Sequence, residues 1–258
     1  MFTPFLAFEG GMYEMNEKYV GKLQRFRELL EEGNAVFFGG AGVSTESGIP
    51  DFRSTDGLYN QQYAYPPEYI ISHSFFNANT KEFYRFYKDK MLFPEAKPNA
   101  CHCGLAQLEK EGKLNAIVTQ NIDGLHQKAG SKTVFELHGS VWRNYCIKCK
   151  KSHTMSEITA SKGIPYCECG GLIKPDVVLY EEGLDDEVVR GSISAIAKAD
   201  TLIVGGTSLV VYPAAGLLEY FHGKHLVVIN RTPTFADANA ELLFTENIGQ
   251  VFNDLKKV

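Results

Sequence analysis

A short apolar run that leads directly into a glycine-rich turn constrains the fold more than any other feature of this sequence. Residues 35–38 read Ala-Val-Phe-Phe, and Gly39-Gly40-Ala41-Gly42 follows at once. A strand that is buried on both faces of a parallel sheet has this composition, because helices cover both faces of such a sheet. The turn carries little side-chain bulk, so its backbone amides can approach a phosphate group near a helix N-terminus. We therefore expect a parallel sheet with a ligand site at the end of this strand.

Further predicted strands alternate with predicted helices along the chain. Short apolar runs predict strands at 116–119, 134–137, 201–204 and 226–229. Apolar residues at helical spacing or helix-like composition predict helices near 16–32, 98–111, 185–199 and 213–221. Strands that alternate with helices in this way are typical of an α/β fold with a Rossmann-like, doubly wound parallel sheet.

Two stretches interrupt that alternation. Residues 54–95 are crowded with aromatic side chains, at helical spacing from about Ser74 onward, and predict a smaller inserted helical module. Residues 143–174 hold four cysteines and few large aliphatic residues, which is too little for an independent core unless a metal supports it. We therefore divide the 258 residues into a discontinuous Rossmann-like domain (1–53, 96–142 and 175–258), a helical insert (54–95) and a zinc-ribbon-like module (143–174).

The four cysteines of residues 143–174 have the grouping of a metal site. Cys146 and Cys149 form a C-x2-C pair, and Cys167 and Cys169 form a C-x-C pair. Four thiolates in two pairs suit one tetrahedral zinc ion, and a site closed by four protein ligands is structural. Cys101 and Cys103 lie in a predicted helix on different faces and are interpreted as ordinary helix residues.

Charge and hydropathy exclude some classes of binding partner and indicate a cellular compartment. The chain has 26 basic and 31 acidic residues, a net charge of −5 and no long basic run, which argues against electrostatic binding to bulk nucleic acid or to anionic lipid. No apolar stretch reaches the roughly 18 residues of a membrane-spanning helix, and residues 1–10 lack the positive start of a secretory signal. We expect a cytoplasmic protein with reduced cysteines.

Polar side chains cluster where the predicted strands end. Thr119-Gln120-Asn121-Ile122-Asp123 follows one strand, and His138 follows the next. The carboxyl ends of parallel strands line the ligand crevice of an open α/β sheet, so these groups belong over a ligand. A histidine in this position either caps the strand end or acts as a base, and the residue alone does not decide between the two. His126, on the following helix, is interpreted as structural.

Taken together, these motifs resemble a known family. They are Gly40-Ala41-Gly42-Val43-Ser44 with its continuation to Arg53, Gln120-Asn121-Ile122-Asp123, His138-Gly139, the four cysteines, Lys174-Pro175-Asp176-Val177-Val178, Gly206-Thr207-Ser208 and Val228-Ile229-Asn230. In this order they closely resemble the bacterial-type sirtuins, which are NAD-dependent protein deacylases, over about residues 16–255. The chain departs from the family pattern in its C-x-C pair, in Gly39 where threonine is common, and in Cys103 at a position that is often basic.

The resemblance implies that NAD is consumed as a co-substrate. An acyl-lysine protein or peptide would transfer its acyl group to ADP-ribose and nicotinamide would leave, with His138 as general base and Asn121 orienting the ribose and a water. The resemblance implies NAD contacts from Gly40, Ala41, Gly42, Ser44, Thr45, Asp51, Phe52, Arg53, Gln120, Asn121, Ile122, Asp123, Gly206, Thr207, Ser208 and Asn230. It further implies peptide contacts from Val177, Val178 and Tyr180.

Three alternative functions are considered in addition to the deacetylase. The same cleavage of NAD could serve a protein mono-ADP-ribosyltransferase, or the chain could be a non-catalytic NAD-binding and zinc-binding interaction module. A hydride-transfer enzyme is disfavoured, because Asn230 stands at the strand end where dehydrogenases carry an acidic ribose ligand. Sirtuins that prefer succinyl or malonyl groups carry a Tyr-x-x-Arg pair, whereas here Tyr63 is followed by Ala-Tyr-Pro, so we expect neutral acyl groups.

Overall fold

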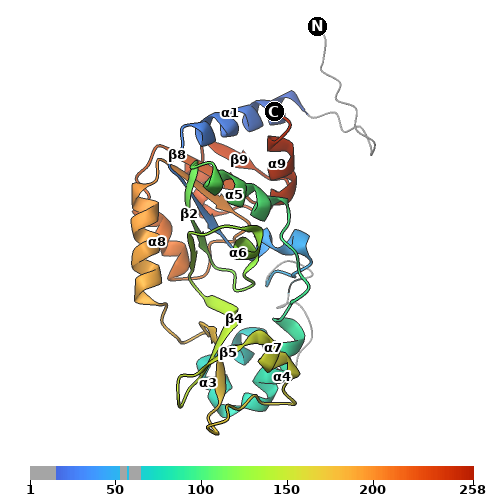
Figure 1. Cartoon of the computed structure of the whole chain (residues 1–258). Helices are drawn as coiled ribbons and strands as arrows, with labels where there is room; N and C mark the ends of the chain where they lie inside the picture. The colour runs from blue at the N-terminus through green and yellow to red at the C-terminus, as the bar shows by residue number, and fades with distance from the viewer. Residues whose placement is uncertain (1–15, 53–56, 58–64) are drawn as a thin grey trace, which may run out of the picture.

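The computed structural model describes residues 16–52, 57 and 65–258, and its largest element is a six-stranded sheet (Figure 1). All neighbouring strands in this sheet are parallel. Their order is β3 (Val134–Glu136), β2 (Leu114–Thr119), β1 (Ala35–Gly39), β7 (Thr201–Gly205), β8 (His225–Ile229) and β9 (Leu242–Phe244). The order reverses at β1, because β2 and β7 lie on its two sides, and such a switch point opens a crevice at the strand ends. The predicted doubly wound parallel sheet is confirmed.

Helices cover both faces of this sheet and make two hydrophobic cores. One core joins Phe37 of β1 to α1 (Glu17–Glu31), α5 (Ala100–Lys110) and α9 (Ile248–Leu255). The other joins Val36 and Phe38 to α8 (Asp186–Lys198) and to the 3-10 helix η4 (Ala214–Tyr220). In Figure 1, α8 lies on one side of the sheet, and α5 and α9 lie on the other. Because β1 sends alternate side chains into two cores, all five of its residues are buried.

A second group of elements forms a smaller lobe below the sheet in Figure 1. It contains α2 (Pro67–Ile70), α3 (His73–Ala78), α4 (Thr80–Lys90), α7 (Met155–Ala160) and an antiparallel sheet in the order β5 (Ser152–Thr154), β4 (Gly139–Cys146), β6 (Ile173–Val177). Residues 143–174 have few aliphatic side chains of their own. They share one hydrophobic core with the aromatic residues of α3 and α4. Phe83 and Tyr84 pack there with Ile158 and Ile173.

Some boundaries differ from the sequence prediction. β4 runs across the predicted domain boundary at 142/143 and β6 runs across the one at 174/175, while the division into domains itself stays a prediction. β9 and the three strands of the antiparallel sheet are not among the strands that the sequence predicts. The helical stretch predicted near 213–221 is a 3-10 helix. The other described elements are α6 (Leu125–Ala129), η1 (Ala41–Val43), η2 (Thr45–Ser47) and η5 (Phe235–Asn239).

Candidate active site

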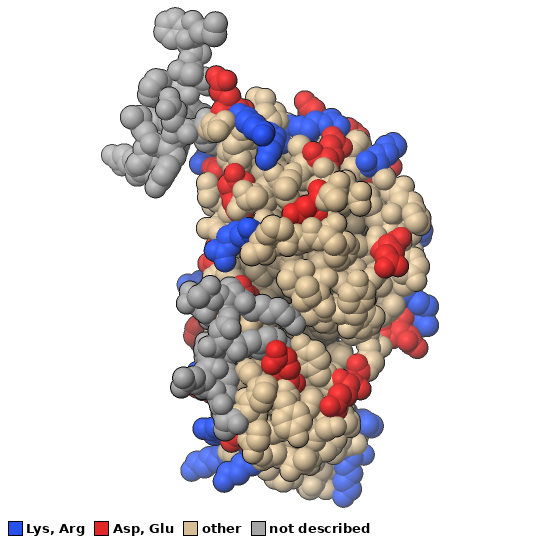
Figure 2. Space-filling view, turned by 180° about the vertical axis from the view of Figure 1, so that it is seen from behind, with Lys and Arg blue, Asp and Glu red and all other residues tan. Residues whose placement is uncertain are grey.

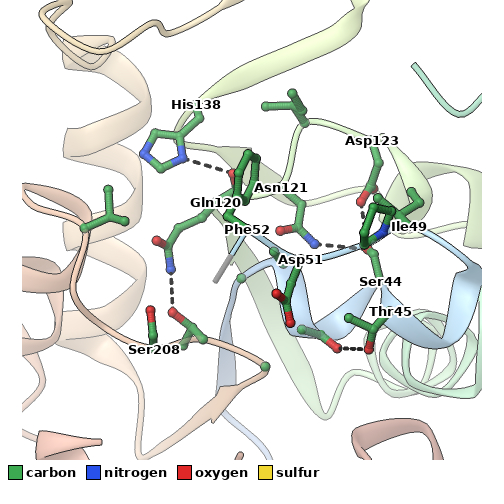
Figure 3. A pocket seen from close by; sticks show the side chains of 18 of the residues that line it. Ser44, Thr45, Ile49, Asp51, Phe52, Gln120, Asn121, Asp123, His138 and Ser208 are labelled. Atoms are coloured by element: carbon green, nitrogen blue, oxygen red, sulfur yellow. Dashed lines mark hydrogen bonds between the residues drawn. The ribbon is translucent and has the colours of Figure 1, made fainter. Parts of the chain in front are cut away.

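A cavity of about 410 Å³ lies between the carboxyl ends of the parallel strands and the smaller lobe (Figure 3). Every predicted NAD or peptide contact that the structure describes lines it. These residues are Gly40, Ala41, Gly42, Ser44, Thr45, Asp51, Phe52, Gln120, Asn121, Ile122, Asp123, His138, Val177, Val178, Tyr180, Gly206, Thr207, Ser208 and Asn230. Arg53 and Tyr63 lie outside the described residues. The structure thus brings together residues that lie up to 190 positions apart, while their individual roles stay predictions.

The glycine turn after β1 packs closely against the loop after β7. Gly42 N donates to Gly206 O at 2.8 Å. A Cβ on Gly40 would lie 2.9 Å from Thr207 Cβ, and a Cβ on Gly42 would lie 2.9 Å from Gly206 Cα. Side chains at either position would force the two loops apart. Glycine at both positions is therefore required by the packing of the two loops, at the place where the sequence predicts a phosphate-binding turn.

Ser44 connects the turn to the loop after β2. Its hydroxyl donates to Asp123 Oδ2 at 2.7 Å and accepts from Asn121 Nδ2 at 3.1 Å (Figure 3). The other Asp123 oxygen accepts from Leu125 N at 2.8 Å, at the start of α6. Burial raises the pKa of Asp123, and the hydrogen bonds from Leu125 and Ser44 oppose that rise. The side chains of Asn121 and Asp123 are thus held in fixed orientations at the cavity wall.

His138 has a defined tautomer when it is neutral. Its Nδ1 lies 3.0 Å from Gln120 O, and a carbonyl oxygen can only accept, so Nδ1 carries the proton and donates. Nε2 is then the basic nitrogen. Burial lowers the pKa of His138 below its ordinary 6.5, although the hydrogen bond to Gln120 opposes that shift. His138 is therefore mainly neutral at pH 7, with one nitrogen able to accept a proton.

The Gln120 side chain spans the crevice between the two halves of the sheet. Its Nε2 donates to Thr207 Oγ1 at 3.0 Å, which joins the loop after β2 to the loop after β7 (Figure 3). Its backbone carbonyl holds His138 at the same time. One residue therefore connects the histidine to the side of the crevice where Thr207 and Ser208 lie.

The four predicted zinc ligands converge in the smaller lobe. The Sγ atoms of Cys146, Cys149, Cys167 and Cys169 all lie within 4.8 Å of one another. Cys146 and Cys169 are 3.4 Å apart, and Cys149 and Cys167 are 3.7 Å apart. Tetrahedral zinc with bonds of about 2.3 Å requires sulfur–sulfur separations of about 3.8 Å, so the thiolate set fits one structural zinc ion.

Two glycines explain how the C-x-C pair reaches the ion. Gly170 has a φ of +76°, and its N–H donates to Cys167 O at 2.8 Å, which closes a tight turn around Cys169. A Cβ on Gly171 would lie only 2.6 Å from Cys146 Sγ. Glycine at these two positions lets both sulfurs face one ion despite the shorter spacing.

His126 is buried in the layer behind the site, as its structural interpretation required. Its ring lies 4.8 Å from that of His102 of α5, centroid to centroid, and its two ring nitrogens have no hydrogen-bond partner among the described residues. Burial lowers the pKa of His102 to about 4 and that of His126 to about 3. In the same helix as His102, Cys101 is buried and Cys103 is exposed, so the two cysteines do lie on different faces.

Sequence reasoning missed several residues of the cavity wall. Trp142 and Val141 reach it from β4, and Lys90, Met91 and Phe93 reach it from the end of α4. The aromatic spacing that predicted the helical insert marks buried positions but does not show which side chains reach the strand ends. Trp142 follows no periodic pattern.

In the part of the chain that the structure describes, no helix is long and apolar enough to cross a membrane.

Comparisons with known proteins agree with this geometry. The sequence model of the Sir2 family matches residues 40–213. The chain belongs to the Sir2 family. It is 60% identical over 235 residues to a protein from Clostridium perfringens named NAD-dependent protein deacetylase, and the match covers 89% of this chain and 96% of that one. A Clostridium acetobutylicum protein of the same name is 57% identical over the same shares.

Solved Sir2 structures have the same fold. A Sir2 in complex with a p53 peptide and NAD+ superposes with a TM-score of 0.81 at 40% identity, and the match covers 91% of this chain and 97% of that one. A Sir2 bound to an acetylated peptide gives a TM-score of 0.81 at 38% identity with the same coverage. The Rossmann-like sheet is therefore that of a Sir2 protein.

Proposed function

We propose that this chain is an NAD-dependent protein-lysine deacetylase that transfers a neutral acyl group to ADP-ribose and releases nicotinamide. The observation that carries the proposal is His138. It is a neutral imidazole whose tautomer is fixed by Gln120 O, and it lines the same cavity as Asn121 and Asp123. The names of the Clostridium relatives support the same activity.

The two sides of the crevice would divide the NAD molecule between them. The turn from Gly40 to Ser44 would hold the pyrophosphate, and Thr207, Ser208 and Asn230 would hold the adenosine half. Ile122 and Asp123 would bind the nicotinamide carboxamide, with the Asp123 carboxylate held by Ser44 and by Leu125 N. Thr45, Asp51 and Gln120 line the cavity beside them. The NAD contact predicted for Arg53 rests on the sequence.

NAD, when bound, supplies the ribose carbon that receives the acyl oxygen. His138 would accept a proton from a ribose hydroxyl through Nε2, because Nδ1 already carries a proton donated to Gln120 O. The Asn121 amide, whose Nδ2 is fixed by Ser44, would orient the ribose and a water through its oxygen. Phe52, half-buried at the cavity wall, would exclude water from the reacting carbon.

The substrate peptide would lie along residues 177–180, where β6 ends. Val178 N donates to His138 O at 3.0 Å, which places this segment directly beside the proposed base. Val177, Val178 and Tyr180 line the cavity, and Tyr180 N donates to Ile71 O at 3.1 Å. An added extended strand is recognised mainly through its main chain, so we expect weak sequence selectivity around the acyl-lysine.

The cavity wall of the smaller lobe favours neutral acyl groups. Its residues are mostly apolar, namely Ile71, Met91, Phe93, Val141 and Met155. Lys90 also lines the cavity, and its ammonium is paired with Asp89 at 3.1 Å. A succinyl carboxylate would have to compete with Asp89 for that cation. Removal of succinyl faster than acetyl from the same peptide would contradict this part of the proposal.

We propose that acyl-lysine proteins or peptides are the macromolecular partners and that nucleic acid and membranes are not. On the face shown in Figure 2, Lys and Arg side chains alternate with Asp and Glu, and the middle of the face carries few charges. A broad basic surface, which binding to bulk nucleic acid requires, is not seen on the described part of this face. A cytoplasmic location stays a prediction from the sequence.

The test is an assay of nicotinamide release from NAD with an acetyl-lysine peptide present or absent, with the peptide mass followed in parallel. The wild type should release nicotinamide only with the peptide, which should lose one acetyl group. His138→Ala should lower the rate by roughly 10² to 10⁴-fold, which is the usual contribution of a general base. Nicotinamide release with the acetyl group retained would favour the ADP-ribosyltransferase, and NAD binding without release would favour a non-catalytic module.

A further inference from the structure

Strand β4 contains a three-residue interruption beside the active site. Gly139 and Ser140 pair with Val177 and Asp176 of β6, and pairing resumes only where Asn144 meets Pro175. Residues 141–143 (Val-Trp-Arg) therefore bulge out of this ladder. A bulge bends its strand and redirects its side chains, and bulges are common next to active sites. In Figure 1, β4 is the strand that leads from the large sheet into the smaller lobe, so the bulge lies at the junction of the two.

The first two bulge residues hold the loop that carries Asn121 and Asp123. Val141 N donates to Ile122 O at 3.0 Å, and Trp142 Nε1 donates to Asp123 O at 2.7 Å. The indole lies directly over Gly124, where a Cβ would be 2.7 Å from Trp142 Cδ1. The loop proposed to bind the nicotinamide is therefore fixed by Ser44 through the Asn121 and Asp123 side chains and by the bulge through the backbone.

The third bulge residue holds the two segments on either side of His138. Arg143 Nη1 lies 2.5 Å from Glu136 Oε2, and Arg143 Nε lies 2.7 Å from Asp176 Oδ2. Glu136 precedes His138 by two residues, and its side chain is only 8% exposed. Asp176 directly precedes the peptide segment. Because a guanidinium presents several donors in a rigid plane, one arginine can hold two carboxylates at a fixed separation, which a lysine cannot do.

We propose that the bulge 141–143 is a positioning element that sets the peptide segment and the nicotinamide loop in register across the active site. Trp142 positions Asp123, and Arg143 positions His138 together with residues 177–178. Both are positioning residues, since they act through backbone and carboxylate contacts to the groups that would touch the substrates. The inference rests on the proposed function and adds two residues to its machinery.

The two side chains position groups with different roles, which gives the test: Asp123 would bind NAD, whereas His138 and residues 177–178 would serve catalysis and peptide binding. Trp142→Phe keeps a ring over Gly124 and removes the donor to Asp123 O. It should raise the KM for NAD and the inhibition constant of nicotinamide roughly threefold to tenfold, with the KM for the peptide unchanged. Arg143→Met keeps the side-chain stem and removes both ion pairs. It should raise the KM for the peptide and lower kcat, roughly tenfold in kcat/KM, with the affinity for NAD unchanged.

Trp142 is the only tryptophan of the chain, so its emission reports directly on the bulge. NAD titrations followed by this emission give the NAD affinity of Arg143→Met, and calorimetry gives that of Trp142→Phe. Because Arg143→Met leaves the nearly buried Glu136 unpaired, the double variant Glu136→Gln/Arg143→Met tests the same point without a buried charge. Arg143→Lys should recover only part of the peptide effect.

Two matched substitutions serve as controls. Arg85→Met removes an arginine that pairs with Glu82 on the exposed surface of α4, and Tyr166→Phe alters an exposed aromatic residue of the smaller lobe. Both should behave as the wild type. The inference is overturned if Trp142→Phe and Arg143→Met change the two KM values alike, change neither, or change only the melting temperature. A wild type that does not deacetylate the peptide would instead contradict the proposed function, so the two failures are distinguishable.

Discussion

The large sheet and the smaller lobe hold their halves of the cavity by different physical means. In the large sheet, β1 is buried on both faces and the polar residues follow from where parallel strands end. In the smaller lobe, the segments 65–91 and 139–177 share one core, and the cysteine cluster holds the far end of the antiparallel sheet. The first region should therefore keep its fold when the zinc site is broken, and the second should not.

Loss of a zinc ligand should have the largest effect and should separate the two regions. Cys149→Ser should lose zinc and activity, and hydrogen exchange should show lost protection in β4, β6, α3 and α4 but retained protection in β1, β2 and β7. Structural zinc contributes on the order of 10 kcal/mol in small zinc domains, which is more than one shared core can replace. Cys103→Ser, at an exposed position outside the cluster, is the control. Retained zinc, or retained protection in the smaller lobe, would show that the comparison is wrong.

Acid should destabilise the region of the large sheet before the smaller lobe, which is the opposite of the effect of losing zinc. The folded pKa values of His102 and His126, about 4 and about 3, lie below the ordinary value of 6.5. Below pH 6.5 these two histidines bind a proton in the unfolded chain but stay neutral in the folded protein. The free energy of unfolding therefore falls as pH falls, by roughly 1.4 kcal/mol per pH unit for each histidine. Thermal unfolding should show this loss between pH 6.5 and about 4, and exchange should increase first around α5 and α6.

The variant His126→Phe, which keeps a ring in the same place, should lose less stability over that range than the wild type. His222→Gln, at an exposed position, should behave as the wild type. An equal loss of stability in all three proteins would assign the acid effect to other groups.

Ser44→Ala sharpens the comparison within the large sheet. Asp123 loses one hydrogen-bond donor and Asn121 loses its acceptor, so we expect kcat/KM for NAD to fall about tenfold while the melting temperature changes little. Ser47→Ala, in the neighbouring short helix, should have a smaller effect because its hydroxyl contacts Asn99 instead. Equal rates for Ser44→Ala and the wild type would show that this network does not orient the site.

The smallest effect concerns the acid limb of the pH profile. The neutral form of His138 is the proposed base, and burial places its pKa below 6.5. As pH falls, kcat/KM should therefore decline with a midpoint below 6.5. A decline centred above 6.5, measured where the protein remains folded, would contradict the assigned environment of His138.

The two regions also differ in how far the sequence could predict them. The sequence predicts one site for Gln120, Asn121, Asp123 and His138, because each follows a predicted parallel strand and the ends of these strands meet at one edge of the sheet. The cysteine cluster is equally predictable from the sequence, since the spacing of the ligands reflects the geometry of zinc. Both inferences need only local patterns and one topological rule.

The shared core and the β4 bulge could not be predicted in that way. The aromatic spacing of α4 shows which side chains are buried, but not that Tyr84 and Ile173, 89 residues apart, belong to one core. Trp142 and Arg143 stand in a bulge, where the two-residue period of a strand is broken. Their contacts depend on long-range register, which local propensity does not contain.

The stoichiometry of a single turnover experiment tests the central claim most directly. Wild-type protein, NAD and an acetyl-lysine peptide should yield equal amounts of nicotinamide, deacetylated peptide and acetylated ADP-ribose, and His138→Ala should yield none of the three at a comparable rate. Free acetate without nicotinamide, or a peptide that gains ADP-ribose and keeps its acetyl group, would contradict the account.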